Sequence, residues 1–190
     1  MPAPTSPDGG GEALPRTLLV FGAVLGAAAA TLVGLNRVPD LAGTNPRRVR
    51  AAASLRAVEA RLGQGLLLPS YFPQWLEWPP STIRFTDGPP TIVAFVLDAR
   101  DGSGAALTIV QSFDPDAPLP ERLLPAGTIT ESAPARVGLE PARLARLTLR
   151  DGSTWSELAW TEQGRRVVFR FRPGRGDVLR MARSLRKERP

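Results

Sequence analysis

LARLTLR (residues 144–150), WSELAWT (155–161) and RVVFRFR (166–172) are three strand-like runs that follow one another closely in the last third of the chain. The pairs Asp151-Gly152 and Gln163-Gly164 separate them, and such pairs are typical of tight hairpin turns. In the third run Val167, Phe169 and Phe171 alternate with mostly basic residues, so one face is buried and the other is mostly wet. The three runs therefore predict an antiparallel meander.

The flanking sequence predicts more strands and two helices. Upstream of the meander, residues 82–86, 91–97 and 105–112 are strand-like, and 91–97 is apolar on both faces. Residues 46–62 have helical apolar spacing after Asn45-Pro46, which is typical of a helix start. A closing helix is expected around Val178, Leu179, Ala182 and Leu185. The predicted fold class is α+β: one soluble domain, 46–190, with a mostly antiparallel sheet flanked by an N-terminal and a C-terminal helix.

A long apolar segment lies near the N-terminus. TLLVFGAVLGAAAATLVGL (17–35) has 19 residues and no charge. As a helix it would extend roughly 28 Å, close to the hydrocarbon thickness of a bilayer. We expect a transmembrane helix at 17–35, preceded by a disordered tail (1–16) and followed by a linker (36–45). A cleaved signal peptide and a buried helix remain as alternatives.

Small residues recur every four positions within this apolar segment. On a helix they would form one ridge that allows two helices to approach closely in lipid, which predicts a homodimer. The residues of this ridge are Gly22, Gly26, Ala30 and Gly34.

Composition excludes several classes of site. The chain has no cysteine and no histidine, which rules out disulfides, thiolate metal sites, Ser-His-Asp triads and Cys-His pairs. No phosphate-binding glycine loop precedes a helix. We therefore expect no catalytic residues, no cofactor and no metal. The net charge of +6 favours anionic partners, although we expect no specific nucleic acid binding.

Two surfaces are candidates for binding. The first is a stripe of cations on the predicted sheet that could contact lipid headgroups or another anion if the wet faces of its strands coincide. Its residues are Arg146, Arg150, Arg166, Arg170 and Arg172. The second is a hydrophobic lip in the proline-rich stretch 66–80, which could instead simply plug one end of the core. Its residues are Tyr71, Phe72, Trp75 and Trp78.

Three short motifs resemble a bacterial family known as domain of unknown function 4367. They are LPSYFP (68–73), LAWTEQG (158–164) and MARSL (181–185), and the likeness covers about residues 46–187. Gln74-Trp75 stand where that family usually has glycine after the first motif. The resemblance implies a domain outside the cytoplasm behind a single membrane helix, and it carries no catalytic residues.

The expected location is the cytoplasmic membrane, with a single span and the C-terminal domain outside the cytoplasm. The arginines that follow the apolar segment point the other way under the positive-inside rule, because they would place the domain in the cytoplasm. These arginines are Arg37, Arg47, Arg48 and Arg50.

The sequence predicts a non-enzymatic binding or sensing domain that faces the envelope, with the bilayer, an envelope protein or anionic lipid as partners. The alternative is a lipid or lipoprotein carrier with an apolar cavity. A filled core would favour the binding domain, and a wide hydrophobic pocket would favour the carrier.

Overall fold

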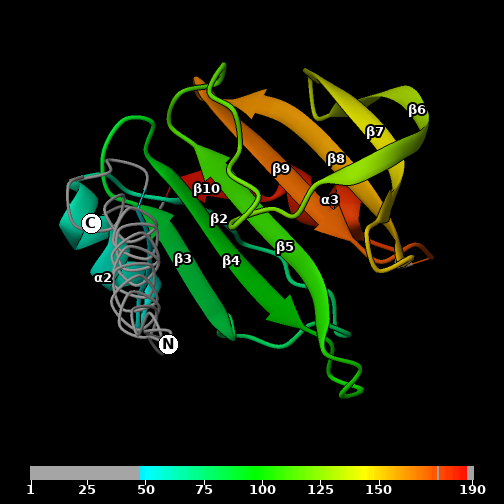
Figure 1. Ribbon diagram of the computed structural model, residues 1–190, viewed down its shortest axis with the longest axis horizontal. Coiled ribbons are helices and arrows are strands. Elements are labelled where there is room, and N and C mark those ends of the chain that lie inside the picture. The colour runs from blue at the N-terminus through cyan, green and yellow to red at the C-terminus, as the bar shows by residue number, and fades with distance from the viewer. Residues whose placement is uncertain (1–47, 175, 188–190) are drawn as a thin grey trace, which may run out of the picture. The chain divides into compact units, whose positions relative to one another are not determined.

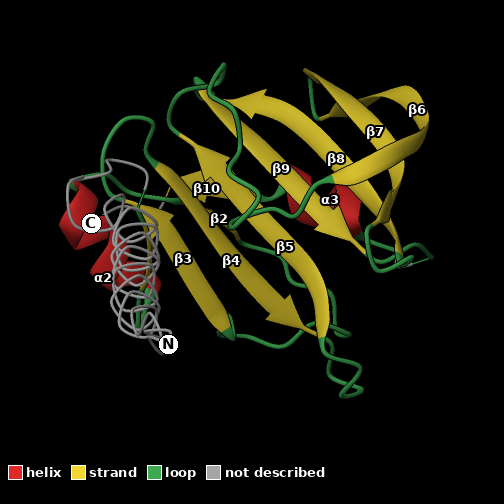
Figure 2. Cartoon of the chain, viewed as in Figure 1, coloured by secondary structure: helices red, strands yellow, loops and turns green. Residues whose placement is uncertain are grey.

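The computed structural model describes residues 48–174 and 176–187. These residues form ten strands and two short helices, and Figure 2 shows that strands predominate. In chain order the elements are β1 (Val49–Ala51), α2 (Leu55–Leu62), β2 (Leu67–Pro69), β3 (Thr82–Thr86), β4 (Ile92–Asp98), β5 (Ala105–Ser112), β6 (Gly127–Val137), β7 (Glu140–Leu149), β8 (Thr154–Glu162), β9 (Arg165–Phe171), α3 (Val178–Arg183) and β10 (Leu185–Lys187).

Eight strands form one antiparallel sheet in the order β1-β3-β4-β5-β9-β8-β7-β6 (Figure 1). The predicted meander is confirmed, since β7, β8 and β9 pair in sequence. Residues 113–126, here called the crossing loop, carry the chain from β5 to β6 at the far edge. The chain then returns strand by strand until β9 pairs with β5 in the middle of the sheet.

The inner face of the sheet is covered by α2, α3 and the small sheet of β2 and β10. In Figure 1, α3 and the small sheet lie behind the large sheet. Directly opposed residues of neighbouring strands point to the same face. One such row consists of Phe95, Ile109, Phe169 and Leu158, and all four are fully buried. Period-2 alternation therefore assigns the large apolar side chains of each strand to one continuous core.

A polar side chain ties the second layer to the sheet. Gln111 on β5 is fully buried within this core. Its Oε1 accepts a hydrogen bond from the Leu67 N–H at 2.9 Å, and its Nε2 donates to the Leu67 carbonyl at 2.6 Å. The amide thus satisfies two backbone groups of Leu67 that would be costly to bury unpaired.

The outer face carries a smaller apolar cluster under the crossing loop, which passes in front of the sheet in Figure 1. Leu123 and Leu124 of the loop pack against a patch of short and branched side chains on the central strands, namely Ile92, Ala94, Val110 and Val168. The outer face is therefore covered locally rather than by a full layer.

The α+β prediction is wrong, because the described chain is mainly antiparallel sheet with only two helices, of eight and six residues. The predicted helix at 46–62 begins only at Leu55, where Ser54 caps it by accepting a hydrogen bond from the Ala57 N–H. Residues 49–51 instead pair with β3 as an edge strand. Pairing with the sheet overrides the local helical spacing there.

The membrane predictions also require correction. Within residues 48–174 and 176–187, neither helix has the length and apolar character needed to cross a bilayer. Eight residues of helix rise only about 12 Å, against a hydrocarbon core of about 30 Å. The expected span at 17–35 lies outside the described residues, so the single-pass anchor and the location in the cytoplasmic membrane have no support in this structure.

Candidate functional site

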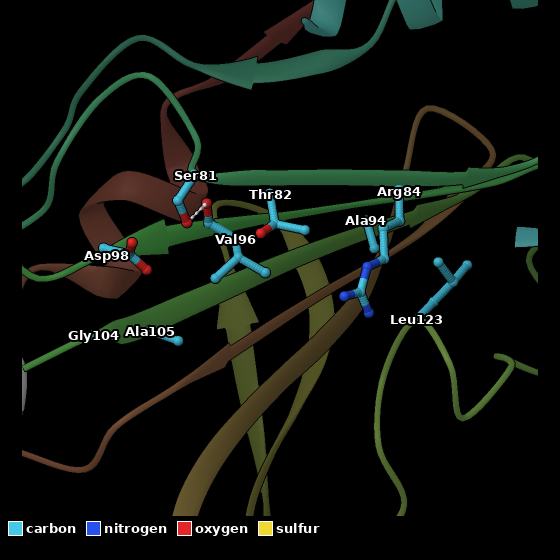
Figure 3. Close-up of a pocket in the computed structure, with 9 residues that line it drawn as sticks. All are labelled: Ser81, Thr82, Arg84, Ala94, Val96, Asp98, Gly104, Ala105 and Leu123. Atoms are coloured by element: carbon cyan, nitrogen blue, oxygen red, sulfur yellow. Dashed lines mark hydrogen bonds between the residues drawn. The ribbon is translucent and has the colours of Figure 1, made fainter. Parts of the chain in front are cut away.

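A groove of about 500 Å³ lies on the outer face, over β3, β4 and the start of β5 (Figure 3). Short side chains form its floor, and Leu123 of the crossing loop stands at one side. The residues that line it are Ser81, Thr82, Arg84, Ala94, Val96, Asp98, Gly104, Ala105 and Leu123.

Strand register places the lining residues on one face. Thr82 is opposite Val96, and Arg84 is opposite Ala94, so both pairs share the outer face. Their neighbours Ile83 and Phe85 point into the core on the other side. The groove exists because the floor residues have short side chains and the crossing loop covers only the adjoining part of the face.

A register shift builds one end of the groove. Leu97 is opposite Leu107, but Asp98 is opposite Ala105, so Ala106 is an extra residue in β5. Ala106 is fully buried. Such bulges re-aim the side chains beside them, and here Asp98 and Ala105 both line the groove.

The groove contains one positive and one negative side chain. Arg84 is exposed, and among the described residues its guanidinium donates one hydrogen bond, to the Arg122 carbonyl at 3.3 Å. Asp98 is half-buried. Within the part of the chain that the structure describes, neither side chain forms an ion pair and the Asp98 carboxylate accepts no hydrogen bond. Both charges are therefore available to a ligand.

The two charges lie at different places along the groove. Arg84 is opposite Ala94, and Asp98 is four residues further along β4. At about 3.3 Å per residue, their backbone positions are about 13 Å apart along the strand. Figure 3 shows Thr82 and Val96 between them.

The predicted stripe of cations is divided between the two faces of the sheet. Arg146 is opposite Ser156, which is opposite Phe171, whereas Arg170 is opposite Glu157, which is opposite Ala145. Adjacent residues of a strand point to opposite faces, so Arg146 and Arg170 lie on different faces. The structure therefore does not bring these two arginines together.

Most arginines of this set are engaged within the chain. Arg146 pairs with Glu131 at 3.2 Å, and Arg150 pairs with Glu121 at 3.4 Å, both in exposed positions. Such exposed pairs contribute little to stability. Arg166 is half-buried and is opposite Thr161. It lies four residues before Arg170 on β9, so the two side chains point to the same face.

Arg170 and Arg172 have the most partners. Arg170 is buried and pairs with buried Glu157 at 2.6 Å, and it also donates to the Pro125 carbonyl. The guanidinium of Arg172 stacks over the Trp155 ring at 5.6 Å and donates to the Ala105 and Ser103 carbonyls. Through these hydrogen bonds Arg170 connects β9 to the crossing loop at Pro125, and Arg172, directly after β9, connects it to the loop before β5 at Ser103.

The predicted hydrophobic lip lies at the edge of the core. Tyr71, Phe72 and Trp75 are half-buried against the main cluster. Trp78 is 45% exposed and contacts the Phe72 ring at 4.6 Å between centroids. Beside this pair is a shallow hollow of about 300 Å³, to which Arg186 contributes. Three of the four aromatic residues therefore serve packing, and Trp78 is the most exposed of them.

Hydrogen bonds lower the pKa values of two aspartates elsewhere on the surface. The hydrogen bond from Arg61 is the main cause that lowers the pKa of Asp87. Desolvation opposes this shift, and the positive charges of Arg61 and Arg50 lower the pKa further. The pKa of Asp151 is lowered by hydrogen bonds from the Ser153 hydroxyl and N–H, which hold the turn between β7 and β8. Both aspartates are engaged in structure.

The remaining predicted sites concern metals and the helix ridge. Among residues 48–174 and 176–187, no group of three or more acidic side chains is arranged to hold a metal ion. The predicted ridge of Gly22, Gly26, Ala30 and Gly34 lies outside the described residues.

Sequence reasoning did not single out Arg84 or Asp98. Arg84 occupies an outward position of the predicted strand 82–86, and Asp98 directly follows the predicted strand 91–97; a charged side chain is ordinary at both places. The available signal was alternation: TIRFT (82–86) places Arg84 between two buried residues, which fixes its face. No local pattern could show that β5 and the crossing loop would complete a groove around it.

Comparison of the chain with known protein families, curated proteins and solved structures found no match. The resemblance to domain of unknown function 4367 therefore stays a prediction.

Proposed function

We propose that residues 48–187 form a non-catalytic binding module that takes an amphiphilic ligand in the groove on the outer face of the sheet. The observation that carries this proposal is the groove itself, which combines an apolar floor with an arginine and an aspartate that lack charged partners among the described residues. Concave sites with mostly apolar linings and a few polar groups are the usual form of ligand sites.

The distribution of charge in the groove favours binding over catalysis. Acid–base chemistry needs groups within hydrogen-bond reach of one reacting atom. The titratable side chains among the lining residues are Arg84 and Asp98, with backbone positions about 13 Å apart along the strand. At that separation the two groups are suited to holding two ends of a ligand.

The packing of the inner face favours this module over a lipid carrier. A carrier needs a hollow between the sheet and its covering helices. Here that space is filled by fully buried side chains such as Phe95, Phe169 and Met181. The groove on the outer face is open to solvent and suits a surface-bound ligand.

Titration of the full chain with anilinonaphthalene sulfonate, an apolar anion, tests the proposal. We expect saturable binding, with NMR amide shifts confined to the groove strands β3, β4 and β5. Ala105→Trp, which places an indole in the groove at an exposed position, should abolish these shifts. Ala60→Trp, at an exposed position on α2, is the matched control and should leave them unchanged. Equal binding by both variants, or shifts that map elsewhere, would refute the proposal.

A further inference from the structure

We propose that the ligand of the groove is an extended peptide segment of about five residues, with an acidic group at Arg84 and a basic group at Asp98. This inference rests on the proposed binding function and names the chemical class of the ligand. It follows from three features of the groove: its two unneutralised charges, their spacing, and the small size of its floor residues.

The charges define a ligand with two ends of opposite sign. Arg84 can present several guanidinium donors, since a single backbone carbonyl accepts from it among the described residues. Asp98 presents a half-buried carboxylate with no hydrogen-bond donor or ion pair there. Because burial makes an uncompensated charge costly, a basic group that reaches Asp98 gains more than it would at a fully exposed acid.

The spacing selects a peptide over smaller or single-ended molecules. Arg84 and Asp98 are separated by four residues of strand, or about 13 Å. A free amino acid cannot span this length, whereas an extended ligand of five residues, with its charged residues four positions apart, matches it, because its backbone has the same rise. A fatty acid carries one charged end and would leave Asp98 without a partner.

The floor allows a backbone to lie close to the sheet. Ala94, Gly104 and Ala105 are small residues that line the groove, and Val96 is the largest floor side chain. Leu123 provides an apolar contact from the crossing loop. A peptide with small apolar residues between its two charges would therefore fit the groove with its ends at Arg84 and Asp98.

Three blocked five-residue peptides test this inference against the full chain. Each has the central sequence Ala-Val-Ala, and the end residues are one Glu and one Lys, two Glu, or two Lys. We expect the mixed peptide to bind the wild-type chain about tenfold more tightly than either same-sign peptide, because each charge-assisted hydrogen bond contributes roughly that factor. Added salt should reduce the difference.

Charge-reversal variants make the test specific. Arg84→Glu gives the groove two acidic ends and should shift the preference to the peptide with two Lys. Asp98→Lys gives it two basic ends and should shift the preference to the peptide with two Glu. Arg56→Glu and Glu140→Lys, at exposed positions outside the groove, are the matched controls and should keep the preference of the wild-type chain.

The outcomes separate this inference from the function on which it rests. If the sulfonate dye maps to the groove but the three peptides bind equally, or none binds, the peptide inference is wrong and the binding module stands. If decanoate binds in the groove and depends on Arg84 alone, the ligand is a single-ended anion and the inference is likewise wrong. If neither dye nor peptide shifts the groove amides, the proposed function itself fails.

Discussion

Gln111 bonds both backbone polar groups of Leu67 through the two polar atoms of its amide, so one side chain of β5 joins the large sheet to β2. Both residues are fully buried, and water cannot take over either hydrogen bond. The small sheet that covers the inner face is therefore attached to the large sheet through a specific polar contact as well as through apolar packing.

The first prediction concerns this contact. Gln111→Leu should lower the free energy of unfolding by about 2–4 kcal/mol, because it leaves a buried N–H and a buried carbonyl of Leu67 without partners. Urea denaturation of the full chain measures the change. Gln64→Leu, at an exposed position, is the control and should change stability by less than about 0.5 kcal/mol. Equal stability of both variants would show that the amide contact contributes nothing.

The second prediction concerns the buried ion pair of Glu157 and Arg170. Glu157→Leu should cost about 3–5 kcal/mol, because it leaves the buried Arg170 guanidinium without its counter-charge. The double variant Glu157→Leu/Arg170→Met removes both charges and should recover most of that loss. Unfolding curves of the single and double variants provide the measurement. A double variant no more stable than the single variant would contradict the argument.

The third prediction concerns the apolar row across the inner face. Phe169 is fully buried on β9 and lies between Ile109 and Leu158 in the register. Phe169→Ala should cost about 3–5 kcal/mol through lost burial and the cavity that remains. Leu139→Ala, in the hairpin between β6 and β7 where the side chain is 89% exposed, should cost almost nothing. Thermal unfolding compares the two, and a similar shift for both would contradict this account of the core.

The fourth prediction concerns pH. Arg61 and Arg50 pair with Asp87 and lower its pKa in the folded state. A lowered folded-state pKa gives stability that is present above the unfolded value of about 4 and is lost as pH falls through the folded value. Asp87→Asn should therefore be less stable than wild type at pH 6, and the two should converge below pH 4.

Urea midpoints measured from pH 7 down to pH 2 check this dependence. Asp116→Asn, in the exposed crossing loop, is the control and should show no such convergence, because the Asp116 side chain has no ion pair among the described residues. A constant difference between wild type and Asp87→Asn at all pH values would show that the pairing with Arg61 and Arg50 is not its cause.

The sequence by itself determined the meander of β7, β8 and β9. Turn pairs at Asp151-Gly152 and Gln163-Gly164 and the alternation of apolar residues are local signals, and each hairpin joins neighbours in the chain. Alternation also assigned Val167, Phe169 and Phe171 to one face. These features depend only on residues close in sequence, so they can be predicted without knowing the rest of the fold.

Tertiary structure decided what depends on partners far away in the chain. Residues 49–51 have helical spacing but form a strand, because β3 offers them backbone hydrogen bonds. Arg146 and Arg170 lie on opposite faces of the sheet, because the register between β7, β8 and β9 fixes the face to which each side chain points. The groove at Arg84 and Asp98 needs three strands, a bulge at Ala106 and a loop that crosses the sheet. Register and loop placement are set by packing of the whole domain, and no short stretch of sequence encodes them.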